Sequence, residues 1–304
     1  MRVDPFYSTN LVSSLDQVQS TEEQLTEELS SGVRVTSLGD DPVAAGENVV
    51  LVNQIQQDDS FTTSASTVTS RLQVADSTLG SVVTELTSAI TLATSANNGT
   101  MNSSDVKSIG SQISGILDEV ESLANTSYQG QYIFAGSQTS TAPFTTSTAS
   151  SPAVTTYNGD QDVNYLETPN GQKIQLNVPG SQIFTGSGSN SVFAALNSLV
   201  ADYSSGTVDT SQAVSDTEAL STALNYVSQQ RVTIDNSITQ VSAASDAVSS
   251  EKTQLTAAQT NLLQADTAQV STQLSLSETQ QTALEDVISE LNSTSNDLFS
   301  KLPG

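Results

Sequence analysis

The feature that most constrains this chain is a heptad stripe of apolar residues that occurs near both ends of the sequence. The first stripe has spacings of four, three, seven and four, with Glu22 at the skipped position, and comprises Leu11, Leu15, Val18, Leu25 and Leu29. The second has the same spacings, with Ser295 in the gap, and comprises Leu284, Ile288, Leu291, Leu298 and Leu302. Apolar residues that repeat every 3.5 positions are typical of helices paired along a narrow seam. We therefore expect both ends to be helices that pack on each other or on neighbouring molecules.

Helix signals also fill most of the chain between the two stripes. Asp41-Pro42 combines an N-cap residue with a proline at the first helical position, so a helix is predicted to begin there. Its apolar spacing continues to Asn97-Asn98-Gly99, which is a stop signal. A shorter helix is predicted to follow from a cap near Ser103 or Ser104, with one apolar face formed by Val106, Ile109, Ile113, Leu117 and Val120. From Ser215 to Leu302 the sequence contains no Pro and no Gly, so one or two very long helices are expected.

The middle of the chain has a different character. Residues 128–184 are rich in Gly, Pro, Thr and aromatic residues, with short β-branched runs at 132–134 and 174–178. Asn158-Gly159 and Asn170-Gly171 are dipeptides suited to tight hairpin turns. The predicted fold class is therefore mainly α, an elongated bundle of long helices formed by both chain ends, with a small all-β insert domain in the middle.

The residue types that are absent exclude most catalytic chemistry. The 304 residues include no His and no Cys, so a nucleophile paired with a histidine base, a thiolate zinc site, a haem site and a disulfide are all excluded. With 33 acidic and 8 basic residues, the net charge of −25 argues against nucleic acid or anionic lipid as a partner. We expect no enzyme activity, no cofactor, no metal and no membrane insertion. The carboxylate pair Asp40-Asp41 is interpreted as helix capping.

The narrowness of the two stripes bears on how the ends become ordered. An intramolecular antiparallel bundle is one interpretation of the stripes. However, a seam with one or two apolar residues per turn buries little surface against an ordering cost of about 1 to 2 kcal/mol per residue. The terminal helices are therefore predicted to gain full order when many chains pack together, as in an assembling structural subunit.

Two segments resemble a known family. Ser31-Gly32-Val33-Arg34-Val35 followed by Asp40-Asp41-Pro42-Val43-Ala44-Ala45 resembles the N-terminal motif of the flagellin superfamily, in the form typical of flagellar hook-associated proteins. The segment from Leu123 to Phe144 looks like the signature of the members that join the hook to the filament. The residues that carry the resemblance are Arg34, Asp40, Asp41, Pro42, Asn125, Gly130, Tyr132, Ile133, Phe134, Ala135, Gly136, Pro143 and Phe144.

The resemblance implies an architecture and a set of partners. It implies a coiled-coil assembly region of residues 1–40 and 265–304, a helical rod of residues 41–136 and 187–264, and an outward-facing β domain of residues 137–186. It also implies export through the flagellar type III apparatus to the hook–filament junction. The implied partners are hook-associated protein 1, flagellin, other copies of the chain in a ring, and an export chaperone.

Two alternatives remain open at this stage. The chain could be a flagellin filament subunit, although flagellins usually have Asp-Asp-Ala-Ala-Gly where this sequence has Asp41-Pro42-Val43-Ala44-Ala45. It could also be a secreted adhesin or carbohydrate-binding stalk protein, with Tyr157 or Tyr165 of the insert stacking on sugar.

Overall fold

The computed structural model describes residues 5–149, 151–186 and 191–300, and within these ranges the chain is mainly helical. The helices are α1 (Pro5–Ser31), α2 (Pro42–Asn97), α3 (Ser103–Ala124), α4 (Val192–Ser204), α5 (Thr210–Leu263) and α6 (Thr267–Ser300). The strands are β1 (Ser127–Tyr128), β2 (Gln131–Tyr132), β3 (Phe144–Ser147), β4 (Val154–Tyr157), β5 (Tyr165–Glu167) and β6 (Lys173–Gln175), followed by a π-helical turn, η1 (Ser181–Thr185). The predicted fold class, long helices at both ends with a strand-rich middle, is confirmed.

The chain divides into two compact units. A terminal unit comprises Met1–Gln56 with Lys252–Gly304, and a central unit comprises Gln57–Glu251. The helices α2 and α5 each contribute residues to both units. The finer division into coiled coil, rod and outward-facing β domain stays a prediction.

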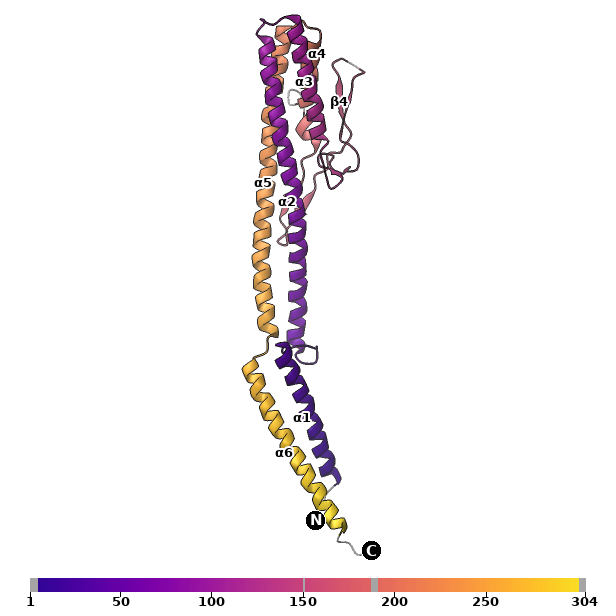
Figure 1. Ribbon diagram of the computed structural model, residues 1–304, viewed down its shortest axis with the longest axis vertical. Coiled ribbons are helices and arrows are strands. Elements are labelled where there is room, and N and C mark those ends of the chain that lie inside the picture. The colour runs from indigo at the N-terminus through magenta and orange to yellow at the C-terminus, as the bar shows by residue number, and fades with distance from the viewer. Residues whose placement is uncertain (1–4, 150, 187–190, 301–304) are drawn as a thin grey trace. The chain divides into compact units, whose positions relative to one another are not determined.

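In the terminal unit, α1 and α6 lie side by side and run antiparallel (Figure 1). The last turns of α1 meet the first turns of α6, where Leu25, Ala265 and Val270 form a small buried cluster with Leu274 against it. This cluster is the best-buried part of the helix pair among the described side chains, so the pairing of the two ends rests on a thin core.

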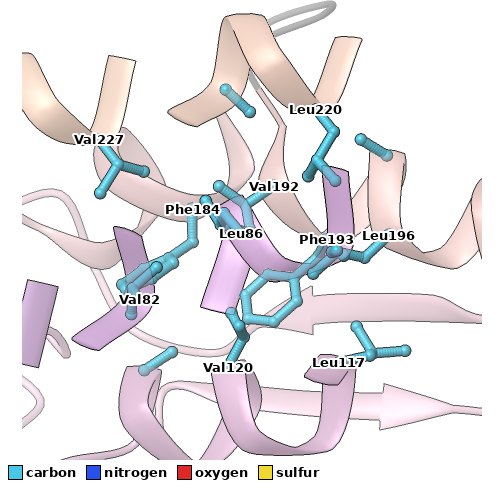
Figure 2. Packing of buried hydrophobic residues seen from close by; sticks show 14 of the residues in the cluster. Val82, Leu86, Leu117, Val120, Phe184, Val192, Phe193, Leu196, Leu220 and Val227 are labelled. Carbon is cyan, nitrogen blue, oxygen red and sulfur yellow. The ribbon is translucent and has the colours of Figure 1, made fainter. Parts of the chain in front are cut away.

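The central unit holds the main hydrophobic core, to which α2, α3, α4 and α5 all contribute. Leu79, Val82 and Leu86 of α2 are fully buried, and the predicted apolar face of α3 is buried along its whole length. Figure 2 shows Val82 and Leu86 of α2, Val120 of α3 and Val192 of α4 among the side chains of this core. The spacing of apolar residues along each helix therefore predicted which face is buried.

The strands form three separate antiparallel pairs, β1–β2, β3–β4 and β5–β6. The β3–β4 pair contacts α3 and α4, whereas Ile174 of β6 packs in a second cluster with Phe61 of α2 and Val241 of α5. The β insert thus contributes to the same core as the helices. Its strands cover less than the predicted runs 132–134 and 174–178: β2 includes only Tyr132 of the first run, and β6 includes only Ile174 and Gln175 of the second.

The predicted turns were partly correct. Asn170-Gly171 joins β5 to β6, with Gly171 at φ +80°. Asn158-Gly159 instead follows β4 and closes no strand pair; there the amide of Asn158 donates to the carbonyl of Pro143, at 2.7 Å. The N-cap of α3 is Asn102, whose side chain accepts from the amides of Ser104 and Asp105, one residue before the predicted position.

Asp202, at the end of α4, is the most perturbed carboxyl group of the central unit. Its Oδ2 atom is buried without a hydrogen-bond partner. Partial burial raises the pKa of Asp202 to about 6, assisted by the neighbouring Asp216 carboxyl and the charge of Asp209. A folded-state pKa above the ordinary value of 3.8 means that ionised Asp202 destabilises the fold as the pH rises through about 6.

Asp202→Asn is therefore expected to stabilise the central unit at pH 7.5 and to leave it nearly unchanged at pH 4. We expect a gain of about 1 kcal/mol, because solvent screens much of this partly exposed charge. Urea unfolding at the two pH values measures the difference. An equal effect at both pH values would contradict the titration of Asp202 as its cause, and Asp105→Asn, at an exposed position on α3, is the control.

Candidate assembly site

The connectors of the terminal unit are joined to each other near Arg34. The α1–α2 connector and the α5–α6 connector form an isolated antiparallel bridge between Val33 and Gln264. The amide of Arg34 donates to the carbonyl of Leu263 at 2.6 Å, and the amide of Ala265 donates to the carbonyl of Gly32 at 3.0 Å. Backbone hydrogen bonds thus hold the α1–α2 connector against the α5–α6 connector.

The motif residues Arg34, Asp40 and Asp41 shape the first connector. The guanidinium of Arg34 forms an ion pair with Asp41, at 3.1 Å, and also donates to the carbonyl of Leu262. Asp41 caps α2 by accepting from the amides of Val43 and Ala44, at 3.2 and 3.0 Å, which confirms the predicted helix start at Pro42. The hydrogen bond from Ala44, followed by the interaction with Arg34, lowers the pKa of Asp41.

Asp40 closes the turn that precedes the cap. One of its oxygens accepts from the amides of Ser37 and Thr36, at 2.8 and 2.9 Å, and from the Thr36 hydroxyl at 3.1 Å. The other oxygen accepts from the Ser37 hydroxyl at 3.0 Å. These bonds, that from the Ser37 amide first, lower the pKa of Asp40. Both carboxylates of the pair therefore serve as local caps.

The predicted seam of α1 lies toward α6 for most of its length. Leu25 is buried, and Leu11, Leu15 and Val18 are half-buried, as is Glu22 at the skipped position. Leu29 is exposed. The buried position in the last turn is occupied by Glu28, which is only 8% exposed and accepts a hydrogen bond from the side-chain Nε2 of Gln24 at 3.2 Å. Leu29 is thus not brought into this helix pair.

The predicted seam of α6 is placed only in part. Leu284, Ile288 and Leu291 are half-buried on the side that carries Val270 and Leu274. Leu298 and Leu302 lie outside the described side chains. An assembly role for the ten seam residues therefore stays a prediction.

Sequence reasoning missed the first half of the α6 seam. Val270 and Ser277 are buried, and Leu274 and Gln281 are half-buried. With Leu284 they keep the spacing of four, three, four and three, so the heptad period could have been extended backwards. The polar residues Ser277 and Gln281 hid that signal.

The second group of motif residues, from Asn125 to Phe144, belongs to the central unit and is closed by hydrogen bonds between its two ends. Asn125, the C-cap of α3, donates from its side chain to the carbonyl of Phe144 and accepts from the amide of Phe144, both at 2.9 Å. This pair of bonds ties the end of α3 to the start of β3. Gly130, at φ +79°, forms the β1–β2 turn, and Tyr132 lies half-buried in β2.

The consecutive residues Ile133, Phe134, Ala135 and Gly136 are all buried. The carbonyl of Phe134 accepts from the amide of Gly180 at 2.8 Å and from the Tyr157 hydroxyl at 3.0 Å. Gly136 has φ +69° and contacts Asp160, so a side chain at this position would be strained and would clash. Only glycine fits there.

Pro143 and Phe144 complete this group and bring in an aromatic cluster. The ring centroid of Phe144 lies 5.1 to 5.3 Å from those of Tyr157, Phe184 and Phe193. Burial, with the nearby charge of Asp160, raises the pKa of Tyr157 to about 12. The motif residues from Asn125 to Phe144 thus act mainly through packing and hydrogen bonding inside the central unit, and the sugar-stacking role considered for Tyr157 has no support here.

The described residues of the site form surfaces for packing, and they include no cluster of reactive side chains. In the described part of the chain, no group of three or more Asp, Glu, His or Cys side chains is placed to hold a metal ion. None of the helices in those ranges combines the length and apolar content needed to cross a bilayer. Several large apolar side chains of the terminal unit are exposed instead.

Residues 6–139 match the family model of the bacterial flagellin N-terminal helical region. Flagellar hook-associated protein 3 of Salmonella typhimurium is 32% identical over 187 residues, which is 61% of this chain and 57% of that protein. The protein of the same name from Escherichia coli is 38% identical over 119 residues, 39% of this chain and 38% of that protein. The aligned regions thus span less than two thirds of either relative.

A solved structure shares the fold. The flagellar junction protein FlgL from Legionella pneumophila superposes with a TM-score of 0.57, at 14% identity, over 72% of this chain and all of that one. The shared fold extends beyond the region in which the sequences align. Sequence motifs, helical architecture and family match agree: the chain is similar to the bacterial flagellin N-terminal helical region over residues 6–139, and to flagellar hook-associated protein 3 over the aligned regions.

Proposed function

We propose that this protein is a structural subunit of the bacterial flagellum that forms the junction between hook and filament. The observation that carries the proposal is the motif segment from Asn125 to Phe144, whose two ends are joined by reciprocal hydrogen bonds. The chain that contains it is similar to hook-associated protein 3. The thin core between α1 and α6 adds support, since helices that bury so little alone gain from packing in an assembly. No catalytic role is proposed.

The same assignment suggests the partners. Hook-associated protein 1 would lie on the hook side, flagellin on the filament side, and further copies of this chain beside it in a ring. An export chaperone would mask α6 before secretion. The net charge of −25 and the scarcity of Lys and Arg agree with an absence of nucleic acid among the partners.

The two alternatives lack a comparable observation. A filament subunit is disfavoured because the curated relatives described above are hook-associated proteins. An adhesin would need an accessible binding surface on the β insert, but Phe144 and Ile174 of its strands are buried against helices. Tyr165 is exposed, but as a single aromatic ring it gives no argument for a sugar site.

Deleting the gene in the source bacterium is expected to leave hooks without attached filaments and to release unpolymerised flagellin into the medium. Electron microscopy of the cells and immunoblotting of the medium measure the two effects. Complementation with the intact gene is the control, and it should restore filaments. Normal filaments on the deletion strain would refute the junction assignment.

A further inference from the structure

The first turns of α2 present an apolar face that nothing in the described structure covers. Val43, Val49 and Val50 are 71%, 59% and 59% exposed, and all point away from the side on which Ala44 is buried. Three valines at such exposure within eight residues are unusual in a chain whose surface is otherwise dominated by Ser, Thr and acidic residues.

Gly46 lies between these valines, and nothing in the described part of the chain packs against it. It lies inside a helix, where glycine costs about 1 kcal/mol relative to alanine. Its φ is not in the left-handed region, and a Cβ built on it meets nothing within 4 Å. Neither backbone conformation nor internal packing therefore requires a glycine at this position. A notch of this kind between apolar side chains does suit the close approach of another helix.

A second uncovered strip lies on α6 of the same unit. Leu276, Gln280, Ala283 and Val287 are all exposed and follow the heptad spacing of four, three and four. They lie on a flank of α6 separate from the side that faces α1. Leu276 is 58% and Val287 41% exposed. A helix flank with heptad spacing is suited to pairing with a further helix.

We propose that the face of α2 formed by Val43, Gly46, Val49 and Val50 receives the α6 strip of a second copy of this chain. The inference rests on the proposed function and specifies one contact through which copies would meet. Because the two surfaces differ, the contact is heterologous, and it leaves one free face of each kind on every pair of copies. Such a contact can extend into a ring or helical array.

Charge favours this occupant. Two copies that each carry a net charge of −25 repel each other, so a contact between them must use surfaces without like charges. None of the four residues of the α6 strip is ionisable. Of the acids between them in the sequence, the helical period places Glu278 and Glu285 on the opposite side of α6 and Asp286 about a quarter turn away. Glu47 is the single acidic residue within the eight residues of the α2 face. An uncharged strip packed against an apolar notch meets this requirement.

Cysteine cross-linking can test the pairing cleanly, because the chain contains no Cys. Cells would carry Val50→Cys with Val287→Cys in one chain as its only copy, and sheared flagella would be treated with a short bismaleimide. We expect a ladder of dimers and higher multimers on an immunoblot. The control chain pairs Val50→Cys with Val232→Cys on α5 of the central unit, where Val232 is more exposed than Val287, at 58% against 41%. It should give no ladder.

Three results would overturn the pairing. No ladder from the test chain would do so, as would an equal ladder from the control chain. A dimer from the single variant Val50→Cys, without higher bands from the double variant, would place the α2 face against itself.

Gly46→Leu provides a second test that is separate from folding. Leucine fills the notch without an internal clash, so the melting temperature of the purified chain should equal or exceed that of the wild type. In the double-cysteine background the cross-linked yield should fall about tenfold, because filling a packed contact typically costs 1 kcal/mol or more. Gly115→Leu on α3 is the matched control, since Gly115 also has nothing within 4 Å of its Cβ but is not flanked by exposed valines. An unchanged yield with Gly46→Leu would overturn the proposal.

The outcome can be distinguished from failure of the proposed function. If gene deletion removes filaments but Gly46→Leu leaves both the ladder and the filaments intact, the junction role stands and the α2 contact is refuted. If deletion leaves normal filaments, the proposed function itself is refuted, whatever the cross-linking shows.

Discussion

Phe144→Ala is expected to lower the free energy of unfolding of the central unit by about 3 to 5 kcal/mol, the range typical of a buried phenylalanine truncated to alanine. Phe144 is fully buried, and its ring lies between those of Phe184, Phe193 and Tyr157. The backbone of Gly180 also packs closely against it, since a Cβ on that glycine would lie 2.8 Å from the ring. The surrounding groups come from β4, η1 and α4, so the cavity left by the ring cannot collapse easily.

Urea unfolding followed by circular dichroism measures this loss, and amide exchange of α3 and α4 assigns it to the central unit. Tyr165→Ala is the matched control, because Tyr165 belongs to the same β insert but is 55% exposed. It should change the free energy of unfolding by less than about 0.5 kcal/mol. A loss below about 1 kcal/mol for Phe144→Ala would contradict the role assigned to the aromatic cluster.

Leu25→Asp should separate α1 from α6 in the terminal unit and leave the central unit folded. Leu25 is the largest buried apolar residue of the cluster with Ala265 and Val270, and Glu28, one turn away, is already a buried acid. A second carboxylate there would lose apolar burial and add repulsion between like charges, at a cost of about 3 kcal/mol or more. A helix pair with so thin a core is not expected to withstand that loss.

Hydrogen exchange followed by mass spectrometry measures this effect. Peptides from α1 and α6 should lose protection in the variant, whereas those from α3 should keep it. Leu29→Asp is the matched control: Leu29 lies one turn further along the same helix but is 38% exposed, so protection should persist. If α1 and α6 stay protected in Leu25→Asp, the small cluster is not what holds the two ends together.

Much of the fold could be predicted from local signals. Asp41 and Pro42 predicted the start of α2 because capping depends on a few adjacent residues and their backbone amides. Asn97-Asn98-Gly99 predicted its end, and Gly99 has φ +68° there. The faces of α2 and α3 that are buried followed from the 3.6-residue period, which any amphipathic helix obeys.

The break between α5 and α6 could not be predicted in the same way. Residues 264–266 contain no Pro and no Gly, yet the helix stops there. Gln264 instead pairs with Val33, and Ala265 donates to Gly32, residues more than two hundred positions away. The backbone leaves the helix where a distant segment supplies its hydrogen bonds. The one local signal is Asp266, which caps α6 by accepting from the amides of Ala268 and Gln269, and a single Asp within a helical pattern does not predict a break.

The candidate site shows the same division. The heptad period predicted that Leu25 is buried. It did not predict that Glu28 is buried in the last turn while Leu29 is exposed, because that depends on where α1 ends against α6. Polar residues at Ser277 and Gln281 concealed the rest of the α6 seam. Asn125 and Phe144 could be recognised as motif residues, but their reciprocal hydrogen bonds needed the fold to become visible.

By itself, the sequence determined the helical class of this protein, the limits set by missing His and Cys, and the stripes along which its ends pair. Helix period, capping and side-chain chemistry are properties of neighbouring residues, so they can be recognised without a fold. Only the tertiary structure decided that the long C-terminal helix is broken at residue 264, that the β insert shares the helical core, and that Gly46 faces open space. Each of these depends on which distant segments meet, and that is set by the packing of the whole chain.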